Sequence, residues 1–431
     1  MKDVIVIGAG LAGSEAAYQL AKRNIKVKLY EQKPLKKHEA FKTANFAELI
    51  CSNSLRSNDI YNGVGLLKEE MRHFDSLIME AAEKNAVDSG SSLAVDREGF
   101  SSYVTQKIKN HPNIEVISEE VTKIDKNQVT LIASGPLTQG DLSKSIQELC
   151  GKDYLYFYDA IAPIVKKESI DFNHAYYKSR YEDSKDYINC PLTKEEFDVF
   201  YNELINAKTA NVHDMDKLVV FEGCMPFEEM ARRGKKTLLF GPMKPVGLEH
   251  DGQKPFAVVQ LRKDNAVDSL YNIVGFQTHL TFPEQDRILK LIPALRNVEV
   301  VRHGVMHRNT YINSPNLINN SFQFINYPNL FIAGQISGVE GYVESAASGL
   351  YAAINIYQYL NGEIKQHLSN QTMMGALAEY ISDKHITKLN PMNATFGILK
   401  TDFVGDKKAK KEYMVNNSLK LVDKFIKEID G

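Results

Sequence analysis

The chain has 431 residues, of which 43% are hydrophobic and 25% charged, a composition typical of a folded globular protein of two or three domains. Its net charge of -2 excludes a global basic surface for nucleic acid, so any RNA binding must depend on a local patch. No apolar stretch reaches the roughly 18 residues needed to cross a bilayer, and the N-terminus is typical of a buried strand, not a signal peptide. We therefore expect a cytoplasmic protein without a membrane segment.

The first elements in chain order predict a dinucleotide-binding turn. An apolar strand over 4–7 leads into a G-x-G-x-x-G pattern, and a helix follows over 14–23. Gly8 is suited to the turn, Gly10 lets the backbone approach a pyrophosphate, and Gly13 permits close helix packing. The helix N-terminus adds partial positive charge toward the phosphates.

A second strand over 26–30 follows the first helix and ends at Glu31, whose carboxylate can accept hydrogen bonds from ribose hydroxyls. The alternative is a glycine-rich turn that binds nothing, and the strands, the helix and the acidic residue around the motif argue against it. We therefore expect cofactor binding by Gly8, Ala9, Gly10, Leu11, Ala12, Gly13 and Glu31.

The rest of the chain alternates helices and strands. We predict a polar loop over 33–57, a helix over 65–85, a further element near 97–110, and strands near 114–117 and 129–133. A later strand over 329–333 ends at a glycine, and a helix rich in small residues follows. Glycines at strand ends allow backbone to approach a ligand, so this set of residues is also expected at the cofactor: Gly135, Gly334, Gln335, Gly341 and Tyr342.

The order of these elements predicts an α/β protein with a Rossmann-like domain made of two separated parts. Residues 154–301 have their own strands and many Tyr and Phe residues, which indicates an inserted domain. We therefore place the first part of the dinucleotide-binding domain at 1–153, the insertion at 154–301, and the second part with a C-terminal helical tail at 302–431.

The four cysteines show neither C-x-x-C spacing nor a nearby His pair, so neither a zinc site nor a disulfide framework is suggested. Cys51 and Cys224 occupy polar turns flanked by serine or glycine, where a thiol can be reactive. Cys150 ends a helical segment and Cys190 precedes a proline in a strand-like stretch. We expect these last two to be small buried residues.

Several long, irregular segments carry a family resemblance. They include FAELICSNSLRS at 46–57 and FEGCMP at 221–226, together with segments at 8–17, 93–97, 155–159, 236–249, 272–279 and 304–310. Over nearly its whole length the chain resembles bacterial folate- and flavin-dependent tRNA (uracil-5-)-methyltransferases. The resemblance implies a Rossmann-like FAD-binding domain of the two-dinucleotide-binding flavoprotein type, with a smaller inserted α/β domain.

The resemblance also implies the chemistry. The methyl carbon comes from methylenetetrahydrofolate through FAD, and NADPH or NADH restores the reduced flavin. Carbon 5 of uracil is a poor nucleophile until a thiolate adds to carbon 6. By analogy with the family Cys224 is this nucleophile and Cys51 removes the carbon 5 proton, although the two roles are open to exchange. Tyr342, His279 and the pair His307 and Arg308 are candidates to line a slot where pterin, flavin and uracil stack.

RNA contact is expected from basic residues near the site, because phosphate contacts supply most of the affinity. One basic run follows Cys224 directly and consists of Arg232, Arg233, Lys235 and Lys236. A second run lies at 407–411. Lys244 and Arg262 are single basic residues in matched segments, and either substrate binding or structure would explain them.

Two departures from the family pattern leave the RNA target open. The loop before Phe46 reads Glu39-Ala-Phe-Lys-Thr43 where relatives commonly carry paired histidines, and Gln32-Lys33-Pro34 replaces a usual Met-Arg-Pro. The leading target is the T-loop uridine of tRNA. The alternative is a uridine of 23S ribosomal RNA, since some mollicute relatives resemble enzymes that methylate ribosomal RNA.

Two other classes of protein share part of this sequence pattern. A small-molecule flavin oxidoreductase would share the cofactor half but not the two cysteine segments. A relative of the large flavoprotein that modifies wobble uridine with a partner GTPase would be longer and would carry a C-terminal helical extension. We therefore expect no obligate protein partner, and the oligomeric state stays open.

Overall fold

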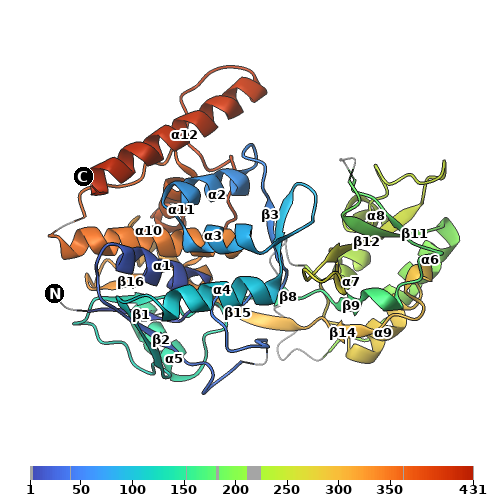
Figure 1. The fold of residues 1–431 in the computed structure, drawn as a ribbon, viewed down its shortest axis with the longest axis horizontal. Coiled ribbons are helices and arrows are strands. Elements are labelled where there is room, and N and C mark those ends of the chain that lie inside the picture. The colour runs from blue at the N-terminus through green and yellow to red at the C-terminus, as the bar shows by residue number, and fades with distance from the viewer. Residues whose placement is uncertain are drawn as a thin grey trace.

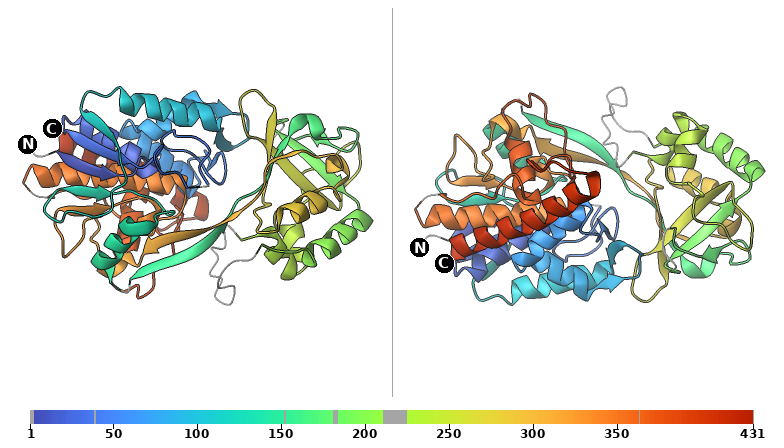
Figure 2. Two further views of the ribbon diagram at one scale, coloured as in Figure 1. Left: turned by 90° about the horizontal axis from the view of Figure 1, so that it is seen from below. Right: turned by 90° about the horizontal axis from the view of Figure 1, so that it is seen from above.

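The computed structural model describes residues 3–38, 40–151, 153–180, 184–210, 225–362 and 364–430. Two units are visible in Figure 1, a larger one that contains both chain ends and a smaller one. A two-stranded antiparallel ribbon of β8 (Tyr154–Ala160) and β15 (Met306–Ile312) runs from the larger to the smaller unit, as both views in Figure 2 show. Among the described helices, none is long and apolar enough to cross a membrane.

The larger unit is built on a five-stranded parallel sheet. Its order is β16 (Leu330–Ile332), β7 (Thr130–Ile132), β1 (Val4–Ile7), β2 (Val27–Glu31) and β6 (Ile114–Ser118). The strands are largely buried, as expected for a parallel sheet that helices cover. The Rossmann-like α/β fold predicted from the sequence is confirmed. The late strand β16 joins the same sheet by pairing with β7.

Helices surround this sheet, and a small antiparallel sheet of β3 (Ser54–Ser57), β5 (Ser92–Val95) and β4 (Ala86–Val87) lies beside it. The helices of this unit are α1 (Leu11–Lys22), α2 (Gly63–His73), α3 (Leu77–Lys84), α4 (Arg97–Lys109), α5 (Gly140–Cys150), α10 (Tyr342–Leu360), α11 (Met373–Ser382) and α12 (Lys407–Asp430).

Small residues let α1 and α10 approach closely. A Cβ on Gly349 of α10 would lie 2.1 Å from the carbonyl oxygen of Ala12 in α1, which is closer than atoms can pack. The two helices therefore cross backbone to backbone, and their N-termini point to one region of the unit.

The smaller unit has its own core around a six-stranded sheet. The strand order is β10 (Tyr176–Tyr177), β11 (Tyr187–Leu192), β12 (Ala257–Lys263), β13 (Leu270–Ile273), β9 (Ile164–Lys166) and β14 (Val300–Arg302), all antiparallel. Helices α6 (Lys194–Ile205), α7 (Phe227–Arg232), α8 (Lys235–Phe240) and α9 (Phe282–Leu289) pack against it.

The prediction of one helix over 65–85 is wrong. The segment forms two helices, α2 and α3, because Asp75 adopts a left-handed conformation with φ 52° and Ser76 starts a new helix. The hydroxyl of Ser76 accepts a hydrogen bond from the backbone N–H of Met79, which satisfies one of the free N–H groups of α3. Near the C-terminus, residues 407–430 form the long helix α12.

A buried carboxylate ties α12 to the larger unit. Glu70 of α2 is fully buried and accepts hydrogen bonds from the backbone N–H groups of Met373 and Met374, at 2.5 and 2.8 Å, and from the hydroxyl of Ser418 at 2.5 Å. It thereby caps the N-terminus of α11 and holds α12. Burial raises the pKa of Glu70 to about 7, because desolvation disfavours the charged form more than the hydrogen bonds favour it.

This raised pKa predicts a pH-dependent stability. The folded state binds a proton at Glu70 up to about pH 7, whereas the unfolded chain releases it near 4.5. Stability from this group is therefore present below pH 4.5 and is lost as the pH rises to 7, by about 3 kcal/mol at most. In Glu70→Gln, which cannot ionise, thermal melting should lack this loss, so its melting temperature relative to wild type should rise between pH 5 and 7.5.

The matched control is Glu69→Gln, because Glu69 is the partly exposed residue next to Glu70. Its melting temperature relative to wild type should not rise between pH 5 and 7.5. Replacing one carboxylate oxygen of Glu70 by an amide NH2 group also changes the melting temperature, by an amount that does not vary with pH. A melting-temperature difference between Glu70→Gln and wild type that stays constant from pH 5 to 7.5 would contradict the raised pKa of Glu70.

Candidate active site

A long cavity lies above the carboxyl ends of β1, β2 and β7. The turn after β1 forms one wall through Gly8, Gly10 and the start of α1. Gly8 has φ 98°, and a Cβ there would lie 2.6 Å from the carbonyl oxygen of Ala133, so only glycine fits. A Cβ on Gly13 would lie 1.8 Å from the Gly8 carbonyl oxygen, which brings α1 directly against the turn.

The N-terminus of α1 is open toward this cavity. Gly10 is the N-cap and has no side chain to satisfy the first N–H groups of the helix. A Cβ built on Gly10 meets no atom within 4 Å, so the space in front of the turn is vacant for a ligand. Free N–H groups and the helix dipole favour an anion there, and a pyrophosphate has the matching charge.

Glu31 marks one end of the cavity. It is buried at the end of β2, and its two carboxylate oxygens accept hydrogen bonds from the backbone N–H groups of Ala9 and Lys33, both at 2.9 Å. These bonds fix the carboxylate beside the glycine turn and leave lone pairs for ribose hydroxyls. The position and orientation are those required for a nucleotide at this end.

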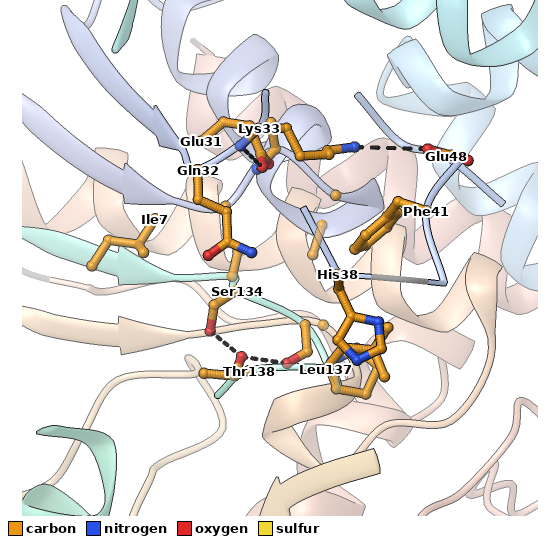
Figure 3. A pocket seen from close by; sticks show the side chains of 18 of the residues that line it. Ile7, Glu31, Gln32, Lys33, His38, Phe41, Glu48, Ser134, Leu137 and Thr138 are labelled. Carbon is orange, nitrogen blue, oxygen red and sulfur yellow. Dashed lines mark hydrogen bonds and ion pairs between the residues drawn. The ribbon is translucent and has the colours of Figure 1, made fainter. Parts of the chain in front are cut away.

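The opposite wall comes from β7 and the loop that follows it. The hydroxyl of Thr138 donates to the Gly135 carbonyl at 2.7 Å and lies 2.8 Å from the Ser134 hydroxyl. Figure 3 shows Glu31 and Ser134 on opposite sides of the cavity, with His38 and Phe41 beside them.

His38 and Phe41 belong to the segment between β2 and β3, which covers the cavity. The buried ammonium of Lys33 donates to the Asn45 carbonyl at 2.5 Å and lies 4.5 Å from the centre of the Phe41 ring. Burial lowers the pKa of Lys33, and nearby Glu31 and Glu48 oppose that shift.

The far end of the cavity combines Cys51 with the start of α10. Cys51 and Tyr342 both line the cavity, and Cys51 is half-buried. The Tyr342 hydroxyl accepts hydrogen bonds from the backbone N–H groups of Cys51 at 2.7 Å and Ser52 at 3.2 Å. Burial raises the pKa of Tyr342, so the phenol stays protonated and holds the Cys51 turn against α10.

The cavity therefore has a buried carboxylate suited to a ribose at one end, a helix N-terminus suited to an anion along its wall, and Cys51 with Tyr342 at the other end. This arrangement fits an extended dinucleotide cofactor whose reactive ring lies near Cys51.

Comparisons with known proteins agree with this geometry. The family model described as "Glucose inhibited division protein A" matches residues 3–364. The methylenetetrahydrofolate--tRNA-(uracil-5-)-methyltransferase TrmFO of Bacillus subtilis is 55% identical over 433 residues, with 99% of each chain covered. The Staphylococcus aureus (strain Newman) protein of the same name is 54% identical over 434 residues, which cover 99% of this chain and all of the relative. The chain belongs to the TrmFO family.

Solved structures support the fold. GidA of Aquifex aeolicus, in its form I crystal, superposes with a TM-score of 0.72 at 16% identity, covering 99% of this chain and 76% of that one. Its form II crystal gives a TM-score of 0.71 at 15% identity, covering 99% and 73%. The fold therefore persists where most of the sequence has diverged.

Most residues expected at the cofactor do line the TrmFO-family cavity. They are Gly8, Ala9, Gly10, Leu11, Ala12, Glu31, Gly135, Gly334, Gln335 and Tyr342. Gly13 and Gly341 are not among the lining residues, so their direct contact with the cofactor stays a prediction. Gly13 packs on the Gly8 carbonyl, as expected for close helix packing, and Gly341 has φ 110° and shapes the start of α10.

The structure does not place the other candidate slot residues, His279, His307 and Arg308, in the cavity lining. His279 does not line the cavity: it is buried in the smaller unit with its Nδ1 atom 2.7 Å from a carboxylate oxygen of Glu228. The side chains of His307 and Arg308, on β15, lie outside the described part of the structure.

Of the remaining cysteines, Cys150 and Cys190 are buried, as predicted. Cys150 ends α5 and is buried, which raises its pKa to about 12. Cys190 is fully buried in β11, which also raises the pKa of its thiol. Cys224 lies outside the described residues, and Met225 after it is buried.

The first basic run is exposed on α7, α8 and the turn between them. Arg232 pairs with Glu229, and Lys235 pairs with Asp198 at 2.5 Å and lies over the ring of Tyr201. Part of the charge of this run is therefore already balanced by acidic neighbours.

Sequence reasoning missed several lining residues. Asn309 of β15 and the segment 119–121 after β6 line the cavity, as do Lys33, His38 and Phe41 of the covering segment. The position of the segment after β6 could have been predicted, because the carboxyl ends of neighbouring parallel strands lie at the same edge of the sheet. Asn309 had none, since only the β8–β15 ribbon brings it there.

The vacant space at Gly10 predicts the effect of a side chain. In Gly10→Val, the added carbons enter the space expected for the pyrophosphate, so the purified protein should lose the yellow flavin absorbance expected of the cofactor. The control Gly397→Val changes a loop glycine outside the cavity, where the nearest atom to a Cβ is 3.8 Å away, and should stay yellow. A fully yellow Gly10→Val protein would show that the turn does not hold the cofactor.

Proposed function

We propose that this protein is a tRNA (uracil-5-)-methyltransferase that takes its carbon from methylenetetrahydrofolate, contains FAD, and makes 5-methyluridine in the T-loop. The single observation that supports this most is the cavity that runs from Glu31 past the α1 N-terminus to Cys51. Near-complete coverage at 54–55% identity by relatives named for this activity supports the substrate and the carbon donor.

The residues of the cavity fit FAD and define their own tasks. Glu31 would bind the adenosine ribose, and the N–H groups at the start of α1 would hold the pyrophosphate. Tyr342 and Gly334 would bound the flavin end. When bound, FAD supplies the means to carry the one-carbon unit and to reduce it, and we infer that NADPH or NADH supplies the electrons.

The thiols carry the chemistry on uracil. A thiolate that adds to carbon 6 makes carbon 5 nucleophilic, and a base then removes the carbon 5 proton. We assign the addition to Cys224 and the proton removal to Cys51. Cys51 is suited to its task because it is half-buried and lines the cavity at the flavin end. An exchange of the two roles is an outcome of the test below.

RNA binding is assigned to the exposed run Arg232, Arg233, Lys235 and Lys236, which follows Cys224 in the chain. Such contacts would hold phosphates while a loop uridine is turned out of its stack into the site. The relatives are named for tRNA, so a 23S ribosomal RNA target is less favoured. The division at 1–153, 154–301 and 302–431, and a cytoplasmic location, stay predictions.

The carbon donor can be tested directly. Methylation of a tRNA transcript should require methylenetetrahydrofolate together with NADPH or NADH, because the cavity fits a dinucleotide cofactor. Label from the folate methylene carbon should appear in 5-methyluridine, measured by mass spectrometry of the digested RNA. Methylation with S-adenosylmethionine as the sole donor would contradict the proposal.

The nucleophile and the RNA can be tested by trapping. Wild-type protein should form a covalent adduct with a tRNA transcript that contains 5-fluorouridine, because fluorine at carbon 5 cannot leave as a proton does. Cys224→Ala should bind the transcript yet form no adduct on a denaturing gel. Cys150→Ala is the control, since Cys150 is buried at the end of α5, and it should form the adduct like wild type.

Two further outcomes are informative. An adduct that persists in Cys224→Ala but disappears in Cys51→Ala would exchange the two cysteine roles. Trapping of a 23S ribosomal RNA fragment but not of tRNA would overturn the tRNA assignment and leave the thiol chemistry intact.

A further inference from the structure

The segment 49–53 around Cys51 is held at every residue. Its N–H groups, carbonyls and side chains make hydrogen bonds to three side chains from distant parts of the chain: Tyr342, Arg97 and Arg262. Tyr342 holds the N–H groups of Cys51 and Ser52 from the side of α10. The other two side chains connect this segment to the smaller unit.

Arg262 makes the direct connection. It lies on β12, an interior strand of the six-stranded sheet, and its guanidinium reaches into the larger unit. Nη2 donates to the Ser52 hydroxyl at 2.7 Å, and Nε donates to the Asn53 side-chain oxygen at 3.1 Å. The planar fork of an arginine thus fixes two consecutive residues directly after Cys51.

Asn53 extends this connection. Its side-chain N–H groups donate to the carbonyls of Val95, in the larger unit, and Lys263, in the smaller unit, at 3.0 and 2.9 Å. The amide group therefore bridges the two units, and its oxygen is left for Arg262. Fully used polar groups at a buried position fix a single arrangement.

A second arginine holds the residues before Cys51. Nη1 of Arg97, at the start of α4, donates to the carbonyls of Leu49 at 2.7 Å and Ile50 at 3.2 Å. The same guanidinium pairs with Asp264 at 3.0 Å, two residues beyond Arg262. Both ends of the Cys51 turn therefore depend on the end of β12.

Burial decides between the two explanations of Arg262 left by the sequence. Only 8% of the residue is exposed, so RNA phosphates cannot reach it. Burial lowers the pKa of Arg262 from its ordinary high value, and the group stays charged at neutral pH. A buried guanidinium costs desolvation free energy, which a purely apolar contact between the units would avoid.

We propose that Arg262 is a positioning residue that fixes the Cys51 thiol relative to the smaller unit, whose described residues resume at Met225, directly after Cys224 in the sequence. This inference rests on the proposed function, in which both thiols act on one uracil. If the turn after Cys51 is released, the thiol loses its place although the cofactor and the RNA still bind. A misplacement of about 1 Å can lower a rate by about a hundredfold.

The test compares Arg262→Met with wild type as purified, flavin-containing protein. We expect the turnover number for 5-methyluridine formation to fall about ten- to a hundredfold. The KM for methylenetetrahydrofolate and the affinity for tRNA should stay within about twofold, because Arg262 is not among the lining residues of the cavity. Arg262→Lys, which keeps the charge but not the fork, should recover part of the rate.

Thiol labelling separates positioning from general loss of structure. Iodoacetamide labelling, followed by peptide mass spectrometry, should modify Cys51 several-fold faster in Arg262→Met, while buried Cys150 and Cys190 stay unlabelled. Faster labelling of all three would show a merely structural role. Ser52→Ala removes the same 2.7 Å hydrogen bond but keeps the buried charge of Arg262, and it should reproduce the Cys51 labelling if Arg262→Met does not fold.

Arg287→Met is the matched control, because Arg287 belongs to the same unit but pairs with exposed Glu203 and half-buried Glu284. It should match wild type in turnover and in labelling. Unchanged turnover and Cys51 labelling in Arg262→Met would overturn the positioning role. A wild-type protein that makes no 5-methyluridine would instead refute the proposed function, and the labelling result would still decide whether Arg262 holds the turn.

Discussion

The backbone contact between α1 and its neighbours is the constraint on which the rest of the structure depends. Gly13 packs on the carbonyl of Gly8, Gly8 packs on Ala133, and Gly349 packs on Ala12. These contacts leave no room for a Cβ, so β1, β7, α1 and α10 can meet at only one distance. Because the helices meet there, the N-terminus of α1 and the start of α10 line the same cavity.

The second constraint is polar and joins the two units. The smaller unit has its own apolar core, and the β8–β15 ribbon leads from one unit to the other. At the Cys51 turn the connection consists of charged and amide groups: Arg262, Asn53 and the Arg97–Asp264 pair. Such groups tolerate only a narrow range of geometry, because a buried polar group that is left without its hydrogen-bond partner lowers the free energy of unfolding by about 1–3 kcal/mol. They therefore define where the units stand relative to the thiol.

The parts of the fold that could be predicted are those that local sequence determines. The glycine turn, the acidic end of β2 and the late strand β16 follow from spacing and short apolar runs. The break between α2 and α3 was missed because it depends on one left-handed residue, Asp75, within a sequence that favours a helix throughout. Spacing also does not tell which glycine faces a ligand and which one shapes a helix start, as Gly341 does for α10.

The polar connection at Cys51 could not be predicted for a physical reason. Arg262 and Asn53 are 209 residues apart, and Arg97 and Asp264 are 167 apart, so no local pattern pairs them. His279 illustrates the same limit, since its partner Glu228 lies 51 residues earlier in the chain, in the smaller unit. A thiol in a polar turn is visible in a sequence, but its direction is set by side chains that only the fold brings to it. Under the positioning role proposed for Arg262, the place of the Cys51 thiol depends on the junction between the two units, and the hydrogen bonds to Ser52 and Asn53 offset part of the desolvation free energy of the guanidinium.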